Sequence, residues 1–280
     1  MVRWDYMYQY SIELLTRKAQ EIRIDIITML TTALSGHSAG SLGMTDIFTA
    51  LYFGILKHDA TNPDWEERDR LVLSNGHIVP VRYAAMAHAG YFPLSELGSL
   101  RQFGSRLQGH PERARLPGLE TTSGPLGSGI GQAAGMALSF ALDGKSNTVY
   151  CVTSDGEHDE GNTWEAILFA AKYKLHNLIV IVDRNNIQID GRTDDVLPLG
   201  DLAEKYRAFG WNALDIDGHD FEQIFAAVEN AHLEPTRPTA IIAHTIPGKG
   251  VRFMENNFEW HGKVPSESEA RQALQELQSL

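Results

Sequence analysis

Two short polar segments, each following an apolar run, carry residue types that bind a divalent cation. Asp155 follows one apolar run, and Asn185 lies 30 residues later, after a second. A carboxylate and a carboxamide oxygen, with the backbone carbonyl of Ile187, are ligands that magnesium and calcium prefer. Gly156 has no side chain to keep a diphosphate away from the backbone. Together the two segments predict a site for a metal and a diphosphate, whereas each segment alone is also typical of a turn.

These polar segments can converge only if the runs before them form neighbouring strands. Residues 148–153, 178–182 and 239–244 are short apolar runs typical of buried parallel strands. Between the first two, apolar residues at 164, 167, 168 and 171 have the spacing of a crossover helix. In such an α/β sheet the ligands bind beyond the carboxyl ends of the strands. We therefore expect Asp155 and Asn185 to meet at one edge.

Other segments predict the helices that cover the sheet. Residues 8–34 have apolar residues at helical spacing, and Gly36 follows as a stop. A second helix is expected to begin with Thr45 as its N-cap and to continue to residue 55. Residues 79–89, 202–209 and 221–232 predict three more. The expected fold class is α/β, a mostly parallel sheet with helices on both faces.

Composition excludes several classes of protein. The net charge of -12 argues against binding to nucleic acid, which needs clustered Lys and Arg. An anionic ligand must then be neutralised locally, by a metal or by backbone N–H groups. The single cysteine, Cys151, rules out a disulfide framework, and no stretch has the length and apolarity of a membrane span. With a charged N-terminal segment unlike a signal peptide, we expect a cytoplasmic enzyme without nucleic acid or membrane partners.

Five further segments resemble motifs of the transketolase family, in the order in which that family has them. They are Ser-Gly-His-Ser at 35–38, Leu-Ser-Asn-Gly-His at 73–77, Gly-His-Pro-Glu at 109–112, the glycine-rich run at 120–129 and Trp-His-Gly at 260–262. The Asp-Gly pair followed about thirty residues later by paired Asn also resembles the thiamine diphosphate fingerprint of such enzymes. The resemblance spans roughly residues 12–265 and implies the thiamine diphosphate-binding fold.

The resemblance also implies roles for individual residues. Asp155, Asn185 and the Ile187 carbonyl would hold Mg²⁺, or Ca²⁺ or Mn²⁺ in its place. The catalytic residues would be His37, His110 and His261, lining a sugar channel, and imidazole suits this task because it donates and accepts protons near neutral pH. The implied cofactor-binding residues are His77, Gly124, Pro125, Leu126, Asp155, Gly156, Glu157, Asn185 and His261.

A few positions carry weaker or different implications. Glu160 resembles a family acid at the subunit interface. Ser154 stands where the family usually has the first glycine of the fingerprint, and its small side chain is expected to be tolerated. Lys249 is a candidate for the diphosphate, but it is equally typical of a solvated loop lysine. The remaining histidines are expected to be structural or stay unassigned: His58, His88, His158, His176, His219, His232 and His244.

The resemblance implies the N-terminal subunit of a split transketolase, which transfers a two-carbon ketol unit from a ketose to an aldose, with sugar phosphates as substrates. Residues 1–280 are expected to form a single diphosphate-binding domain, because the chain stops at Leu280. The pyrimidine-binding and C-terminal domains would then lie on a complementary subunit. We expect two copies of each subunit in an α2β2 heterotetramer, and no activity from this chain alone.

Three other interpretations remain open on the sequence alone. The glycines at 127, 129 and 131 are compatible with a nicotinamide-binding Rossmann protein, but no convincing apolar strand leads into them. A second alternative is another thiamine diphosphate enzyme, either deoxyxylulose phosphate synthase or the α-type subunit of a 2-oxo-acid dehydrogenase; the histidine motifs argue against both. The third is a non-catalytic binding module.

Overall fold

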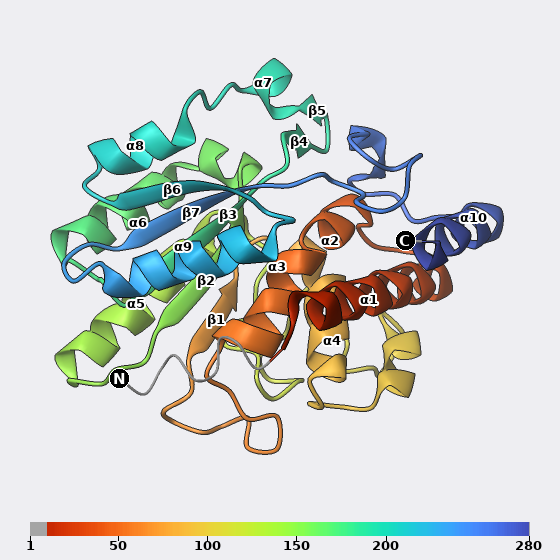
Figure 1. Ribbon diagram of the computed structural model, residues 1–280, viewed down its shortest axis with the longest axis horizontal. Helices are drawn as coiled ribbons and strands as arrows, with labels where there is room; N and C mark the ends of the chain where they lie inside the picture. The colour runs from red at the N-terminus through yellow and green to blue at the C-terminus, as the bar shows by residue number, and fades with distance from the viewer. Residues whose placement is uncertain (1–9, 280) are drawn as a thin grey trace.

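A five-stranded parallel sheet organises the chain, as the computed structural model of residues 10–279 shows (Figure 1). The strand order is β1-β2-β3-β7-β6, and all four neighbouring pairs are parallel. The strands are β1 (Arg70–Leu73), β2 (Val149–Ser154), β3 (Leu178–Arg184), β6 (Asn212–Asp217) and β7 (Thr239–His244). A small antiparallel hairpin, β4 (Ile187–Gln188) and β5 (Gly191–Arg192), follows β3 directly. The predicted strands are therefore confirmed, and they are parallel neighbours.

Helices surround this sheet, and the crossover helix predicted between β2 and β3 is among them. A π-helical turn, Leu51–Ile55, extends α3, and 3₁₀ helices span Gly76–Ile78, Leu94–Ser99, Gly156–Asp159 and Phe258–Trp260. The α-helices are α1 (Ile12–Ala33), α2 (Ala39–Gly43), α3 (Thr45–Ala50), α4 (Val79–His88), α5 (Ser128–Leu142), α6 (Gly161–Lys172), α7 (Thr193–Val196), α8 (Leu202–Ala208), α9 (Phe221–Leu233) and α10 (Glu267–Gln278).

The sheet separates two hydrophobic cores. Side chains of a strand alternate between its faces, so Tyr150 and Val152 of β2 pack into one core, whereas Val149 and Cys151 pack into the other. The first core contains residues of α1, α3, α4 and α9, and the second contains residues of α5, α6 and α8. Figure 1 shows α9 in front of the strands and α10 beside α1. The expectation of helices on both faces is confirmed.

The register of β2 against β3 determines which residues meet at the carboxyl edge. Ser154 pairs with Asp183 as the last partner in the register of these two strands. Asp155 then follows β2, and its backbone N–H donates to the Asp183 carbonyl at 3.1 Å. Asn185 follows Arg184, the last residue of β3. The side chains after both strands therefore emerge at one edge, as the spacing predicts.

Two helix starts differ from the sequence prediction. Helix α1 begins at Ile12, where Ser11 caps it by accepting from the Leu14 N–H; the predicted start at Tyr8 lies outside the described residues. Thr45 is the first residue of α3 rather than its N-cap, and Met44 holds the cap position. The Thr45 hydroxyl instead donates to the carbonyl of Ser41, at 3.0 Å.

Several elements were not predicted, because their sequences lack the usual pattern of a strand or a helix. Strand β1 has only four residues, and β6 interrupts its apolar residues with exposed aspartates. Helix α5 contains three glycines, which are poor helix formers, but Ile130, Ala133 and Ala137 bury its inner face. Gly129 is required there, because a Cβ at this position would lie 2.4 Å from the Ser74 Cβ.

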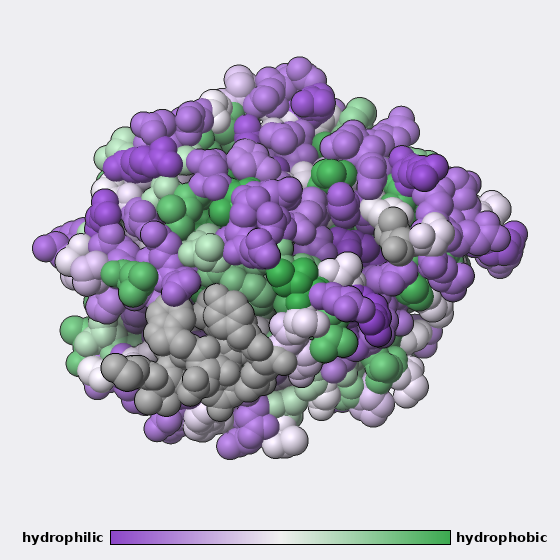
Figure 2. All heavy atoms as spheres, viewed as in Figure 1, coloured by the Kyte–Doolittle hydropathy of each residue, from purple (hydrophilic) through white to green (hydrophobic). Residues whose placement is uncertain are grey.

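Hydrophilic residues dominate the surface shown in Figure 2, and hydrophobic residues are scattered among them. Within residues 10–279, no helix combines the length and the apolar character that crossing a membrane requires.

Candidate functional site

Asp155 lies at the carboxyl end of β2 with its side chain fully buried. Its Oδ2 accepts from the Asn186 backbone N–H at 2.7 Å and from Arg184 Nη1 at 3.3 Å, and Oδ1 accepts from the Gly156 N–H at 2.8 Å. Burial raises the pKa of Asp155 to about 6, against these donors, which lower it. A buried carboxylate of this kind gains from a nearby cation, and here Arg184 supplies one.

Asn185 is oriented by its own neighbours on β3 and β4. Its Nδ2 donates to Asp183 Oδ2 at 2.7 Å, and its Oδ1 accepts from the Ile187 N–H at 3.0 Å. Asp183 is almost completely buried and also accepts from the Thr245 hydroxyl; burial raises the pKa of Asp183 to about 7. Because the amide nitrogen is directed to Asp183, the carboxamide oxygen is left as the acceptor that a cation would use.

We call this region, residues 154–157 and 183–187, the Asp155 edge. The ligands predicted for a cation there are the Asp155 carboxylate, the Asn185 carboxamide and the Ile187 carbonyl, and they suit a hard cation that is completed by phosphate oxygens and water. Among the described residues, no three His, Cys, Asp or Glu side chains are grouped so as to bind a metal by themselves. The chemistry of the residues present therefore fits a cation that arrives with an anionic ligand.

Three glycines leave open space beside the predicted site. A Cβ added at Gly156 would meet only Gln188 Cβ, at 3.8 Å, and one at Gly262 would meet only the His37 ring, at 3.8 Å and beyond. A Cβ at Gly124 would lie 3.7 Å from the His110 ring, and the φ of Gly124 is +157°. Side chains at these positions would project into that space, so the bare backbone fits a ligand that approaches closely.

Three histidines from distant parts of the chain converge on one another. The ring centroids of His37 and His77 are 5.0 Å apart, those of His77 and His261 are 5.0 Å apart, and those of His37 and His261 are 5.7 Å apart. His110 lies beside them, since a Cβ at Gly76 would be 3.2 Å from its ring. The structure thus brings together all four histidines that the sequence motifs single out, and we call them the histidine cluster.

The histidine cluster is poised to stay neutral. Burial, followed by the charges of His261, Arg101 and His110, lowers the pKa of His37 to about 4. Burial also lowers the pKa of His77, His110 and His261, with Arg101 adding to the effect at His110. The buried Nδ1 of His37 has no hydrogen-bond partner among residues 10–279. A neutral imidazole with a free nitrogen can bind a ligand hydroxyl or accept a proton.

Glu157, which the resemblance implies to be a cofactor-binding residue, has a carboxylate that is bonded to protein groups. Its carboxylate is completely buried, and four protein donors occupy its two oxygens. Oε1 accepts from the Ser74 hydroxyl and the Gly127 N–H, at 2.6 and 2.8 Å. Oε2 accepts from the Thr153 hydroxyl and the Ser154 N–H, at 2.6 and 3.0 Å. Glu157 thus joins the ends of β1 and β2 to the start of α5, next to the loop of Gly124, Pro125 and Leu126.

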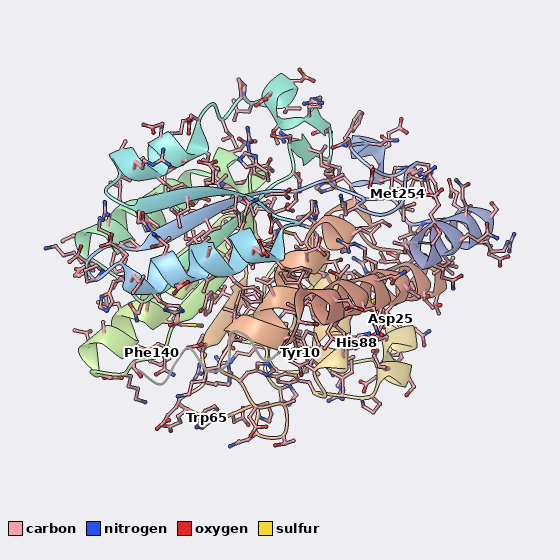
Figure 3. All side chains as sticks on the ribbon, in the orientation of Figure 1. Tyr10, Asp25, Trp65, His88, Phe140 and Met254 are labelled. Atoms are coloured by element: carbon pink, nitrogen blue, oxygen red, sulfur yellow. The ribbon has the colours of Figure 1, made fainter. Side chains whose placement is uncertain are left out.

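Most of the other histidines have structural partners. His88 lies beside Asp25, as Figure 3 shows, with His88 Nε2 2.7 Å from Asp25 Oδ2. The buried ring of His158 contacts the Ser154 carbonyl and the Tyr206 hydroxyl, both at 2.9 Å. Four more have such contacts: His58 with Tyr52 and Tyr91, His219 with Asp46, His232 with Tyr150, and His244 with Asp215.

Lys249 lines a cleft of about 510 Å³ together with Asp215, Asp217, His219 and other residues around the ends of β6 and β7. Thr245 also lines this cleft and donates to the Asp183 carboxylate, so the cleft adjoins the Asp155 edge, although no residue of that edge lines it. The contact of Lys249 with a diphosphate therefore stays a prediction.

Sequence reasoning missed three residues of the site. Asp183 and Arg184 are charged residues at the end of an otherwise apolar, fully buried strand, and that contrast was a signal that could have identified them. Arg101 lies on a loop and gave no such signal. The glycines at 127, 129 and 131 follow a loop rather than a strand, so they lack the context that a nicotinamide-binding fingerprint needs.

Comparison with known proteins identifies a family model that matches most of the chain. The model describes the thiamine diphosphate binding domain of transketolase and matches residues 15–278. The chain is 44% identical to the 6-deoxy-6-sulfo-D-fructose transketolase subunit SqwG of Clostridium sp. (strain MSTE9), over 87% of this chain and 88% of that protein. It is 38% identical to an apulose-4-phosphate transketolase subunit of Actinobacillus succinogenes, over 96% of this chain and 98% of that protein.

Single-chain transketolases are similar over a smaller share of their length. The human enzyme is 38% identical over 97% of this chain and 43% of its own length. The crystal structure of transketolase from Campylobacter jejuni superposes with a TM-score of 0.89 and 35% identity, covering 96% of this chain and 43% of that chain. This chain therefore spans about two-fifths of these longer proteins.

Proposed function

Because this chain belongs to the transketolase family and matches its thiamine diphosphate-binding domain, we propose that it is one subunit of a split transketolase. In this proposal the enzyme transfers a two-carbon ketol unit from a ketose to an aldose, and the chain contributes the diphosphate-binding half of each active site. Two relatives of nearly the same length are named as subunits, which supports a partner chain. A cytoplasmic location stays a prediction.

The Asp155 edge is proposed to hold the cofactor and its metal. Asp155, Asn185 and the Ile187 carbonyl would bind Mg²⁺, with Ca²⁺ or Mn²⁺ as substitutes, and Gly156 would receive the diphosphate. Bound thiamine diphosphate would supply a carbanionic carbon that attacks the ketose carbonyl and acts as an electron sink. The observation that carries the proposal is the 2.7 Å contact between Asp155 and the Asn186 N–H, which joins the two halves of the fingerprint at one edge.

The histidine cluster is proposed to handle the sugar. His37, His110 and His261 would bind hydroxyl groups and move protons around the carbonyl, because their low pKa values leave them neutral and able to accept a proton. His77 and His261 would also contact the diphosphate. Glu157 would act indirectly, by fixing the Gly127 N–H and the preceding loop, since its oxygens are already occupied.

The face formed by α5 and α6 is proposed to receive the complementary subunit. On α6, Leu168 and Phe169 are exposed, and on α5 the exposed Gly135 has no atom of the described residues within 4 Å of an added Cβ. Bare glycine on a helix lets another helix approach closely. The occupant would be the pyrimidine-binding subunit, in a tetramer with two copies of each chain.

Reconstitution tests this proposal directly. The chain alone, with thiamine diphosphate and Mg²⁺, should show no ketol transfer, whereas addition of a complementary pyrimidine-binding subunit should produce it. Substrates should include ordinary ketose phosphates and the two sugars in the names of the relatives. Turnover by the isolated chain would refute the dependence on a partner, and failure of the pair on every ketose would refute the activity.

A substitution locates the interface. Leu168→Glu should weaken association with the partner by about tenfold or more, because it places a charge in an apolar contact. Leu233→Glu is the matched control, since Leu233 is equally a large exposed residue but lies at the end of α9, against the opposite core. Equal effects of the two changes, measured by analytical ultracentrifugation, would argue against this face.

A further inference from the structure

Arg101 reaches between two turns that carry members of the histidine cluster. Its Nη1 donates to the Ser35 hydroxyl at 2.8 Å, and Nη2 lies 3.4 Å from the Gly109 carbonyl oxygen. Ser35 lies two residues before His37, and Gly109 directly precedes His110. One side chain thus contacts both turns.

Gly109 leaves room for the guanidinium, because a Cβ at this position would lie 2.7 Å from Arg101 Cζ. A Cβ on Gly36 would be in ordinary contact with Arg101 Nε, at 3.8 Å. The backbone of Arg101 is left-handed, with a φ of +59°, and its N–H donates to the Leu107 carbonyl at 2.9 Å. A non-glycine residue adopts this conformation only when its surroundings hold it there, so the loop fixes the base of the side chain as well.

We propose that Arg101 is a positioning residue of the proposed transketolase site, which clamps the turns of His37 and His110 together and holds a fixed positive charge beside both imidazoles. This role rests on the proposed function, because it assigns the two histidines to sugar chemistry. Arg101 itself needs no contact with the substrate. Its planar guanidinium can bond two turns at once, which a lysine cannot do with the same geometry.

The charge of Arg101 has a defined electrostatic consequence. The titratable groups that face His37 are His77, His261, His110 and Arg101, and arginine is the one that stays charged at neutral pH. A fixed positive charge disfavours a second one nearby, in agreement with the lowered pKa of both His37 and His110. Arg101 thereby helps to keep both imidazoles in the form that accepts protons.

The experiment measures the pKa values of the histidines in the full chain and the turnover of the chain reconstituted with its partner subunit. Arg101→Gln removes the charge and the clamp. In nitrogen-15 NMR titrations, the pKa of His37 and His110 should rise, and turnover should fall about tenfold or more, with its acid limb moved to higher pH. Affinity for thiamine diphosphate should change less than about twofold, because the Asp155 edge is untouched.

Two further variants separate charge from clamping. Arg101→Lys keeps the charge and should leave the histidine titrations near those of the native chain while turnover still falls, because a lysine cannot hold both turns. Gly109→Ala should displace the guanidinium and reproduce part of the Arg101→Gln effect. Arg106→Gln is the control from the same loop, since Arg106 pairs with Glu96 instead, and it should change none of these quantities.

Two results would overturn the proposal: unchanged titration of His37 and His110 in Arg101→Gln, or a fall in turnover that is equal in Arg106→Gln. The NMR titration needs only the isolated chain, so it reports on Arg101 even if the reconstituted pair transfers no ketol unit. Failure of the proposed function is thus distinguishable from failure of this inference.

Discussion

The Asp155 edge and the histidine cluster are built by different means. The Asp155 edge comes from the ends of two adjacent strands joined by one helix, and the pairing of Ser154 with Asp183 fixes it. The histidine cluster comes from four segments spread over more than two hundred residues, and none of its members lies in a strand. Backbone hydrogen bonds position the first region, whereas turns, glycines and side chains such as Arg101 position the second. The two regions should therefore fail differently when they are altered.

The largest effect is expected at the Asp155 edge. Asp155→Ala should weaken Mg²⁺-dependent binding of thiamine diphosphate by more than about 100-fold, because it removes the charged ligand rather than a supporting residue. Isothermal titration calorimetry with and without Mg²⁺ measures this. Asp159→Ala is the control, since Asp159 is exposed on the neighbouring turn. Equal affinities of the native chain and Asp155→Ala would remove the site from this edge.

A substitution in the histidine cluster should affect catalysis and spare the cofactor. His110→Ala should lower kcat of the reconstituted enzyme about 100-fold, the usual contribution of a proton-transfer group. Its affinity for thiamine diphosphate should stay within about threefold of the native value, since no hydrogen bond joins His110 to the Asp155 edge among the described residues. A parallel loss of affinity would show that the two regions act as one.

A substitution of Glu157 tests whether its hydrogen bonds hold the two regions together. Glu157→Gln should lower the free energy of unfolding by about 2 to 4 kcal/mol, because an amide NH₂ would face donors that now bond to a carboxylate oxygen. Urea titration of the isolated chain measures it. Glu165→Gln, an exposed position on α6, makes the same chemical change and should cost less than about 0.5 kcal/mol. A small and equal effect of both changes would contradict the joining role of Glu157.

The smallest expected effect is on how the stability of the chain falls at acid pH. The pKa of His37 lies near 4 in the folded chain, below its ordinary value of 6.5. Between these values the unfolded chain binds the proton first, so the stability that neutral His37 provides is full above pH 6.5 and is lost as the pH falls toward 4. The slope is at most about 1.4 kcal/mol per pH unit. His37→Asn should make the acid loss of stability shallower in urea titrations, and an unchanged slope would contradict the burial of a neutral imidazole.

The same contrast explains what could be predicted from sequence. The strands 148–153, 178–182 and 239–244 and the meeting of Asp155 with the Asn185 segment followed from apolar runs and spacing, because strand pairing turns sequence distance into position. The four histidines were found only through resemblance to a family, since loops keep no period that would place them. Helix α5 was missed because its glycines disfavour a helix locally, although close packing against Ser74 makes one of them, Gly129, necessary.

Arg101 could not be predicted for a related reason. Its role depends on contacts with Ser35 and Gly109, of which Ser35 lies 66 residues away in the chain. A loop position of this kind has no recurrent spacing, so only the folded geometry reveals it.

The hydrogen-bond ladder between β2 and β3 also sets the distance between the predicted metal ligands. One residue added within either strand would shift Asp155 relative to Asn185 by about 3.3 Å, which is enough to prevent both from binding the same ion. A substitution on the exposed face of α6, for example at Leu168, leaves the ladder as it is. Substitutions on the outer face of this helix can therefore adapt the chain to a different partner subunit, while the register of β2 against β3 keeps the ligands of the site in place.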